Sequence, residues 1–434
     1  MLRYSLILIL IFSMSNIYTQ PYTSYFTGNT DDLVISPLGG TCMMGGATEN
    51  DEAMKWFLQR ANGGDILVLR ASGSDGYNNY LYSQLGVSVN SVETIVFNNA
   101  TASNESYVQQ RISQAEAIWF AGGDQWNYVS FWRNTAIDSL INDGIQNRNM
   151  VIGGTSAGMA ILGSLYYSAE FGSATSSVAL SNPYANSVHI DSTHFLQVPF
   201  LQQVITDTHY DNPDRKGRHI TFLARVLTDW GVSAKGIACD EFTAVCIDET
   251  GLARTYGEYP GYDDNVYFLQ VNCENDTLQP ENCTNGQPLN WNLGGDAVKV
   301  YAVKGTLNGS NTFDLNTWES GTGGNWENWY VDNGTLVEQA DSAINCIPVS
   351  TNSIILSTEL TITPTLVNNN HITLQASHLS NHPITIYNSN GQLIQTFNHT
   401  AYTQQIDVID LNSGVYFLKF KAPNETIIRR FVKL

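Results

Sequence analysis

Short apolar segments alternate with segments of helical spacing between residues 50 and 160. The apolar segments have the length of strands and cover residues 65–71, 94–98, 117–123 and 150–154. The segments whose apolar residues recur at helical spacing cover residues 51–61, 105–114 and 128–144. Strands that are apolar along their whole length are buried on both faces. The alternation therefore predicts an α/β fold with a doubly wound, mostly parallel sheet, in which sites lie at the carboxyl ends of the strands.

The last of these strands runs into the sequence GGTSAG, where Gly154, Ser156 and Gly158 fit the G-x-S-x-G nucleophile elbow. Small flanking residues allow a serine to occupy a sharp, strained turn between strand and helix, with its hydroxyl exposed at the sheet edge. The backbone N–H of Ala157 would then face an oxyanion. Because the pair Gly122–Gly123 closes a neighbouring strand, a shared site at this end of the sheet is expected.

A nucleophilic serine needs a base and an acid that orients the base. The histidines upstream of the C-terminal region are His189, His194, His209 and His219. His209 stands between an apolar stretch and a polar turn that precedes a basic helix start, so it is the leading candidate for the base. His194 is its rival.

Candidates for the acid are Asp240 and Glu241 in the segment GIACDEFTAV. A carboxylate among apolar strand residues is costly unless it is paired. Side chains alternate along a strand, so only one of the two can face the site. Glu170 and Asp207 are the alternatives.

Four motifs together resemble the cyanophycinase and peptidase E family of serine peptidases, and the cyanophycinase branch most closely. They are IWFAGGDQ (118–125), GGTSAG (153–158), DTHY with RKGRH (207–210 and 215–219) and GIACDEFTAV (236–245). The resemblance covers roughly residues 35–305 and implies a sheet like that of class I glutamine amidotransferases. It also implies that Ser156 is the nucleophile, His209 the general base and Glu241 the orienting acid.

The resemblance further implies that backbone donors of Gly123 and Asp124 join that of Ala157 in an oxyanion hole. Gln125 and Arg215 would contact a peptide substrate at an aspartyl bond, such as the β-Asp-Arg bonds of cyanophycin. No cofactor and no metal is implied. One position departs from the family pattern, because proline occupies position 213, where the family usually has arginine, in the loop that borders the substrate.

The two ends of the chain indicate export. Residues 1–20 predict a secretory signal peptide, because a short apolar run follows Arg3 and is too short to span a bilayer. Residues 376–434 resemble the C-terminal sorting domain of the type IX secretion system, through ITIYN, GVYFLKF and IIRRFVKL. The expected organisation is therefore a peptidase domain at 21–345, a linker at 346–375 and a small all-β sandwich. The secretion machinery is the expected partner, and the location is secreted or attached to the cell surface.

The formal net charge of −20 argues against a nucleic-acid partner. No other stretch is apolar and long enough to predict a membrane helix. Strands are expected within 231–258, whereas 259–340 is expected to be irregular apart from a strand at 297–305. Cys273 and Cys283 share a polar loop, which favours a local disulfide between them.

Two other functions are compatible with the sequence. A lipase or esterase of the α/β-hydrolase type needs the chain order serine, acid, histidine, which an acid such as Glu170 could satisfy. A surface-displayed binding protein without catalysis is the second.

Overall fold

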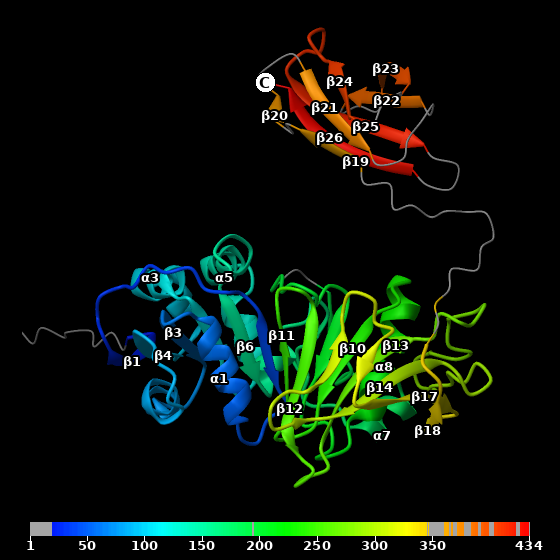
Figure 1. Ribbon diagram of the computed structural model, residues 1–434. Helices are drawn as coiled ribbons and strands as arrows, with labels where there is room; N and C mark the ends of the chain where they lie inside the picture. The colour runs from blue at the N-terminus through cyan, green and yellow to red at the C-terminus, as the bar shows by residue number, and fades with distance from the viewer. Residues whose placement is uncertain are drawn as a thin grey trace, which may run out of the picture. The chain divides into compact units, whose positions relative to one another are not determined.

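The computed structural model describes residues 20–192, 195–344, 346, 360–363, 366–367, 371–376, 383–388, 392–398, 403–421 and 426–433. The chain divides into two compact units, Met1–Ile347 and Pro348–Leu434. The first unit carries the α/β region (Figure 1). The predicted signal peptide lies outside the described residues except for Gln20.

The first unit is organised around a ten-stranded sheet with the order β1-β4-β3-β5-β6-β2-β11-β12-β15-β16. Its strands are β1 (Tyr22–Gly28), β2 (Thr41–Met44), β3 (Asp65–Arg70), β4 (Ser91–Phe97), β5 (Ala117–Phe120), β6 (Val151–Thr155), β11 (Ala244–Ile247), β12 (Leu252–Tyr259), β15 (Asn311–Asp314) and β16 (Gly321–Thr322). The run from β4 to β2 is parallel throughout, which confirms the predicted parallel core. Antiparallel strands extend this core at both ends.

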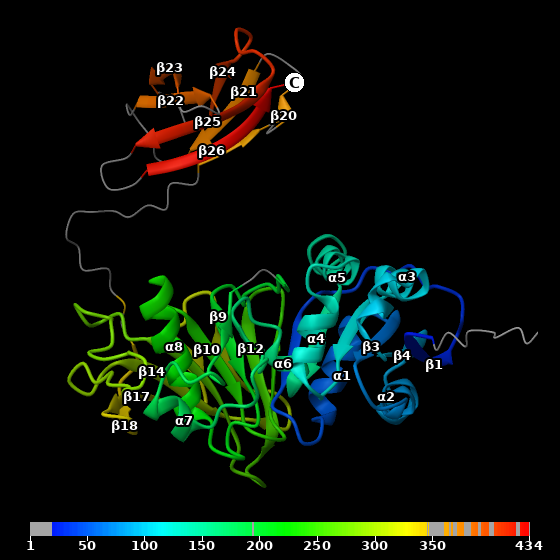
Figure 2. The same cartoon turned by 180° about the vertical axis from the view of Figure 1, so that it is seen from behind.

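Helices cover both faces of the parallel core (Figures 1 and 2). On one face, α1 (Asp51–Arg60) buries Phe57 and Leu58 against Val68 and Trp119 of the sheet. The opposite face is covered by α3 (Ser106–Gln114), α4 (Gln125–Trp132) and α5 (Ala136–Asn147). The core strands are therefore buried on both faces, as the apolar runs in the sequence predict.

A second, six-stranded sheet has the order β18-β17-β14-β13-β10-β9. Its strands are β9 (Val204–Asp207), β10 (Lys235–Cys239), β13 (Asn265–Val271), β14 (Val298–Lys304), β17 (Gly324–Asp332) and β18 (Thr335–Asp341). One face packs on the large sheet, where Phe268 stacks on Phe313 at 4.3 Å between ring centroids. The other face shares its core with α8 (Lys216–Trp230) and α7 (Ser176–Ser181). Only β9 and β10 run parallel in this sheet.

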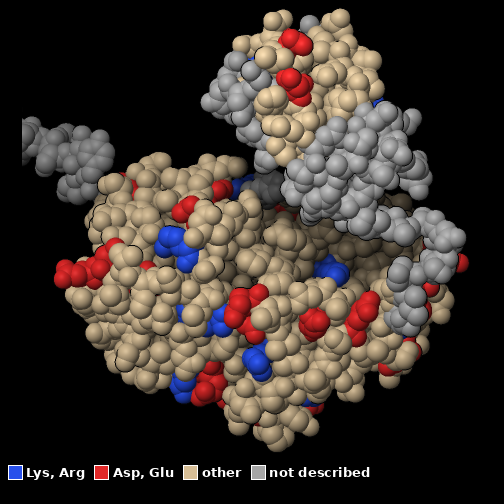
Figure 3. Space-filling model, turned by 45° about the horizontal axis from the view of Figure 1, so that its top comes forward, with Lys and Arg blue, Asp and Glu red and all other residues tan. Residues whose placement is uncertain are grey.

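The surface that Figure 3 shows carries acidic and basic side chains in small, separate groups, and most of it carries neither. The charge of the chain is therefore not gathered into one acidic field on this face. Among the described residues, no helix combines the length and the apolar character needed to cross a membrane.

Two expectations for local structure are wrong. The predicted helix at 128–144 is two helices, because Asn134 adopts a left-handed φ of 60° and Thr135 caps α5 by accepting from the Ile137 N–H at 3.1 Å. The predicted strand at 297–305 is confirmed as β14, but the rest of 259–340 is not irregular, because it also supplies β13, β17 and β18 of the second sheet. The β17–β18 hairpin turns at Asn333–Gly334, a dipeptide typical of tight hairpins.

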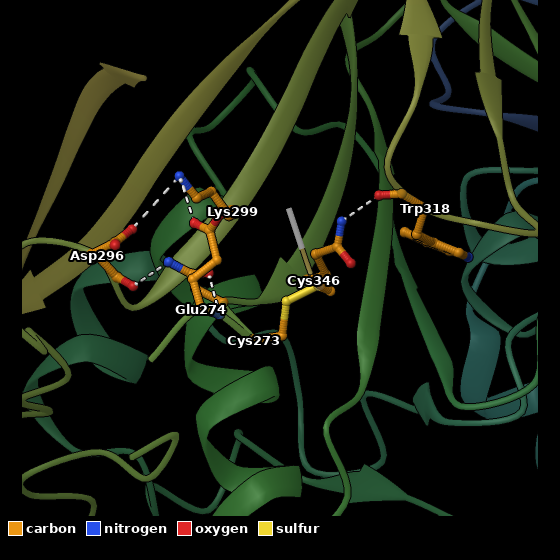
Figure 4. Close-up of a disulfide and its surroundings, with 8 residues drawn as sticks. Cys273, Glu274, Asp296, Lys299, Trp318 and Cys346 are labelled. Carbon is orange, nitrogen blue, oxygen red and sulfur yellow. Dashed lines mark hydrogen bonds and ion pairs between the residues drawn. A yellow bond between two sulfur atoms is a disulfide. The ribbon is translucent and has the colours of Figure 1, made fainter. Parts of the chain in front are cut away.

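The predicted disulfide between Cys273 and Cys283 is also wrong. Cys273 bonds to Cys346, which is 73 residues away (Figure 4). Cys283 is a buried thiol. The chain beyond β18 returns to the end of β13, so the pairing depends on the order of the sheet and not on spacing along the sequence. Beside the disulfide, the buried ammonium of Lys299 pairs with carboxylates of Glu274, Asp296 and Asp341.

The second unit contains two sheets, with the orders β19-β21-β24 and β20-β26-β25-β22-β23. Its strands are β19 (Leu360–Thr363), β20 (Leu366–Val367), β21 (His371–Ala376), β22 (Pro383–Asn388), β23 (Leu393–Asn398), β24 (Thr403–Asp407), β25 (Gly414–Lys421) and β26 (Thr426–Lys433). Side chains from both sheets share one apolar core, as in a small sandwich. The expected hairpin is the β22–β23 pair, although its turn lies outside the described residues. The first strands, β19 and β20, fall within 346–375.

Candidate active site

Ser156 stands between β6 and the short helix α6 (Ala157–Ala160), at the carboxyl end of the parallel core. Its backbone has φ 51° and ψ −117°, a strained conformation for a residue with a side chain. The flanking glycines make this turn possible. A Cβ on Gly154 would lie 2.6 Å from the Gly158 carbonyl carbon, and one on Gly158 would lie 2.2 Å from the Phe120 carbonyl oxygen.

His209 follows β9 at the corresponding end of the second sheet. Its Nε2 lies 2.8 Å from the Ser156 Oγ. Its backbone N–H donates to the Gly45 carbonyl at 2.8 Å, which holds the residue in a left-handed conformation with φ 47°. The imidazole is therefore placed to accept the proton of the Ser156 hydroxyl.

Glu241 follows β10, the parallel neighbour of β9. Its Oε1 lies 2.6 Å from the His209 Nδ1, and its Oε2 accepts from the Asn212 side-chain amide at 3.2 Å. Partial burial acts to raise the pKa of the Glu241 carboxyl, but the hydrogen bonds from His209 and Asn212 outweigh it and the pKa is lowered. The side chains of His209 and Glu241 stay 22% and 16% exposed, so a substrate can reach them.

The pair Gly45–Gly46, which follows β2, lies between the two sheets at this point. The Met44 carbonyl accepts from the Ser156 N–H at 3.0 Å, and the Gly46 carbonyl accepts from the Phe242 N–H at 3.2 Å. A Cβ on Gly46, whose φ is 117°, would lie 2.4 Å from the His209 Nε2. The missing side chain therefore makes room for the imidazole.

Gly46→Ala is expected to lower kcat by about 10²-fold, because displacing a reacting group by about 1 Å costs this much. The rigid imidazole must shift to avoid the new methyl group, and this shift disturbs the 2.8 Å contact of its Nε2 with the Ser156 Oγ. Gly86→Ala is the matched control, since Gly86 also has a positive φ, of 71°, but a Cβ there meets nothing within 4 Å. Steady-state kinetics of both variants decide the matter, and equal activities would contradict this role of Gly46.

Gly122 and Gly123 follow β5 beside Ser156, and a Cβ on Gly122 would lie 3.6 Å from the Ser156 Cβ. The buried Tyr128 hydroxyl lies 2.9 Å from the Ala121 carbonyl and 3.1 Å from the Gly122 carbonyl. These contacts hold the Ala121 and Gly122 carbonyls toward the Tyr128 hydroxyl. Tyr128 thus positions the segment that was expected to supply oxyanion donors.

The side chains of Asp124, Gln125 and Arg215 each have a hydrogen-bond partner within the protein. The Asp124 carboxylate accepts from the Trp126 N–H at 2.9 Å and caps α4, so its side chain is occupied. The Gln125 amide donates to the Tyr167 carbonyl at 3.3 Å. The half-buried Arg215 donates to the Thr208 carbonyl at 3.0 Å, next to His209. Burial lowers the pKa of the Arg215 guanidinium, as does the nearby Arg218.

The rival candidates have other partners. The Glu170 carboxylate lies 3.7 Å from the His189 Nδ1. The buried His219 has its Nε2 3.3 Å from the Ile205 carbonyl, and burial lowers its pKa to about 4. Asp240 is buried and its Oδ2 accepts from the Asn265 N–H at 2.7 Å. His194 lies outside the described residues.

Asp207, which lies two residues before His209, forms a buried ion pair with Arg218 of α8. Burial acts to raise the pKa of the Asp207 carboxyl, but the attraction of the Arg218 guanidinium prevails and the pKa is lowered. The pair therefore stabilises the fold above the ordinary pKa of an aspartate, and this stability is lost as the pH falls through the lowered value.

Arg218→Met is expected to lower the free energy of unfolding by about 3–5 kcal/mol, because it leaves a buried carboxylate without its partner. The pKa of Asp207 would then rise above its ordinary value, so the variant should lose further stability as the pH rises, opposite to the trend for the intact pair. Urea unfolding at several pH values measures both effects. Lys55→Met, which removes an exposed pair with Glu52, should change stability by less than about 1 kcal/mol.

Sequence reasoning missed three contributors to the site. Asn212 holds the Glu241 carboxylate, the Asp211 Oδ1 accepts from the Glu241 N–H at 2.8 Å, and Gly46 makes room for His209. The sequence DNP after His209 marks a turn, and this signal could have drawn attention to Asp211 and Asn212. Pro213, the departure from the family pattern, directly follows Asn212. Within the described ranges, no group of histidine, cysteine and acidic side chains is arranged to hold a metal ion.

Two parts of the chain match known protein families. The family model of peptidase family S51 matches residues 42–253, which include the triad and its glycine pairs. Residues 42–253 are a peptidase family S51 domain. A second model, of a secretion system C-terminal sorting domain, matches residues 367–434. The S51 domain thus ends in β12, and the strands of the second sheet from β13 onward lie beyond it.

Relatives of the S51 domain are distant. The cyanophycinase of Synechococcus elongatus is 25% identical over 210 residues, which are 46% of this chain and 59% of that protein. The chain therefore spans little more than half of this curated relative. A crystal structure of a peptidase from an acI-B1 Actinobacterium is 14% identical, covers 53% of this chain and 94% of its own, and has a TM-score of 0.38. A putative peptidase E protein from Listeria monocytogenes EGD-e is 15% identical, with 51% and 98% covered and a TM-score of 0.33.

Proposed function

We propose that the chain is an exported serine peptidase that works through an acyl-enzyme, with Ser156, His209 and Glu241 as its triad. The observation that carries this proposal is the continuous chain of hydrogen bonds from the Ser156 Oγ through the imidazole to Glu241, with separations of 2.8 and 2.6 Å. The S51 domain supports a peptidase activity independently of this geometry.

In the proposed reaction, the Ser156 Oγ attacks the carbonyl carbon of the scissile bond while the His209 Nε2 takes its proton. Glu241 stabilises the imidazolium that forms. The imidazolium then gives the proton to the leaving amine, the C–N bond breaks and an ester on Ser156 remains. Water attacks the ester, passes a proton to His209 and releases the acid product, and the proton returns to Ser156.

The negative charge on the tetrahedral intermediate needs hydrogen-bond donors that are already in place. The N–H of Ala157 follows the nucleophile directly, and those of Gly123 and Asp124 belong to the loop that Tyr128 holds. The Asp124 side chain is turned back to cap α4, which is consistent with a contribution from its backbone alone.

The proposed substrates are peptide or isopeptide bonds next to aspartate, including the β-Asp-Arg bonds of cyanophycin, because the relatives of the S51 domain are cyanophycinases. Arg215 uses one donor on the Thr208 carbonyl and lies beside His209, which suits contact with a substrate carboxylate. Gln125 is proposed as a second substrate contact. Pro213 directly follows Asn212, whose side-chain amide donates to the Glu241 carboxylate, so the departure from the family pattern lies next to the proposed triad.

The C-terminal sorting domain indicates export to the outside or to the cell surface. We propose that the type IX secretion machinery recognises this domain and that residues 1–20 are a signal peptide. The proposed organisation is a peptidase domain at 21–345 followed by a sorting domain, whose family match begins at residue 367 and not at the expected residue 376.

The esterase alternative needs an acid between Ser156 and His209. Glu170 was the candidate, but its carboxylate lies against His189. The described residues therefore support the order serine, histidine, acid, in which Glu241 comes last. A binding protein without catalysis remains the alternative that an experiment must test.

Two measurements on the full chain test the proposal. A fluorophosphonate probe should label the protein, and peptide mass spectrometry should place the label on Ser156. Incubation with cyanophycin and with α- and β-aspartyl dipeptides, read by mass spectrometry, should show products cut next to aspartate. A label on another residue would refute Ser156 as the nucleophile. A label on Ser156 without cleavage of any substrate in the panel would overturn the proposed substrate class alone.

A further inference from the structure

Two buried cysteines, Cys42 and Cys246, face each other on neighbouring strands. β2 and β11 pair antiparallel with these residues directly opposite each other, and their Sγ atoms are 3.5 Å apart. The Gly45 N–H donates to the Thr243 carbonyl, which marks that pair as hydrogen-bonded. Such pairs alternate along an antiparallel ladder, so Cys42 and Cys246 occupy a position without hydrogen bonds, where opposing side chains lie closest.

Other partners for these thiols are weak or remote. Both point at the Ala53 carbonyl, but at 3.8 Å from Cys42 and 4.0 Å from Cys246. Cys239 packs in the core between the two sheets, whereas Cys42 and Cys246 pack beneath α1. The opposing cysteine is therefore the strongest sulfur contact that either residue makes.

The destination of the chain favours oxidation of this pair. The sorting domain indicates export, and Cys273–Cys346 is already a disulfide. Disulfides form and persist in the oxidising spaces through which exported proteins pass. We propose that Cys42 and Cys246 are joined by a second disulfide in the exported protein.

In this step the two thiols give up two protons and two electrons, and an S–S bond forms between them. The oxidant is the disulfide of a thiol–disulfide oxidoreductase, or of oxidised glutathione in the test below, and it is reduced to two thiols. Both side chains are fully buried, and burial raises the pKa of the Cys246 thiol. Because the thiolate is the reacting form, the bond must form before α1 closes over the strands.

The bond would join two segments that flank His209. β2 leads directly into Gly45–Gly46, whose carbonyls accept from the His209 and Phe242 N–H groups. β11 starts three residues after Glu241. A covalent link between these strands holds the spacing of both segments against the imidazole, and its existence does not depend on the proposed peptidase activity.

Peptide mapping of the full chain tests the disulfide. The protein is isolated after secretion, or refolded with reduced and oxidised glutathione, and its free thiols are alkylated in denaturant. A digest without reductant should contain one cross-linked species that joins the Cys42 and Cys246 peptides, and dithiothreitol should separate it with a gain of two hydrogens. Cys239 and Cys283 should be the residues that carry the alkyl group.

Variants show which thiol pairs with which. In Cys42→Ala, Cys246 should become alkylated, whereas Cys283→Ala should keep the cross-link. The wild-type map decides by itself, so a variant that fails to fold does not affect the result. Alkylation of Cys42 and Cys246 in most molecules, or a cross-link from either of them to Cys239, would overturn the proposal.

Discussion

Ser156→Ala is expected to lower kcat by about 10⁶-fold, the loss typical of removing the nucleophile from a serine triad. The acyl-enzyme cannot form without the Ser156 Oγ, and His209 then has no hydroxyl to deprotonate. KM should change little, because the Gly122–Gly123 loop and Arg215 keep their places. Steady-state kinetics on whichever aspartyl substrate the wild type cleaves would measure the loss.

A matched substitution separates this effect from general damage. Ser113 lies on the exposed face of α3, where its hydroxyl donates to the Gln110 carbonyl, so Ser113→Ala should keep full activity. Both variants should unfold at the wild-type temperature. A Ser156→Ala protein that retains more than about one-thousandth of the wild-type kcat would refute Ser156 as the nucleophile, because the residual activity of a disabled triad is far lower.

The parallel core could be predicted because its signal is local. Each strand from β3 to β6 contains an apolar run next to polar or glycine-rich segments, a pattern that reflects burial on both faces. The nucleophile elbow could also be predicted, because Gly154 and Gly158 are required by contacts within a few residues of Ser156 or with the neighbouring strand β5. The turn at Asn134 was missed because one left-handed residue interrupts an otherwise helical pattern.

The second sheet could not be predicted, because its order joins segments that are distant in the chain. β9 pairs with β10 across α8, and β13 pairs with both β10 and β14. The Cys273–Cys346 bond follows from this order, whereas spacing favoured the nearer Cys283. The edge strand β18 and its neighbour β17 are largely polar and only partly buried, so they lack the apolar run that marks a buried strand.

The same limit applied to the site. The residues alone left His194 beside His209, and left Asp240, Glu170 and Asp207 beside Glu241, until the family resemblance separated them. The β9–β10 register pairs Asp207 with Ala238, so the residues that follow the two strands, His209 and Glu241, emerge side by side. No local sequence pattern predicts this register. Arg218, the buried partner that pairs with Asp207, comes from α8.

Glu241→Gln is expected to lower kcat by about 10³–10⁴-fold while the fold remains intact. The glutamine side chain has the same shape, but it carries no charge to stabilise the imidazolium. Its amide can also present a donor to the His209 Nδ1, which would force the wrong tautomer and leave Nε2 unable to accept the Ser156 proton. Asn212 and the Asp211 contact to the backbone should hold the substituted side chain in place.

Glu170→Gln is the matched control, because it removes the same charge from a carboxylate that lies 3.7 Å from His189 and not from His209. Its kcat should stay within about threefold of the wild type, since a surface charge change of this kind alters energies by less than about 1 kcal/mol. A further readout separates orientation from stability, because Glu241→Gln should lose labelling by the fluorophosphonate probe in proportion to kcat. If Glu170→Gln fell as far as Glu241→Gln, or if Glu241→Gln kept its activity, the charge that assists His209 would have to come from another residue.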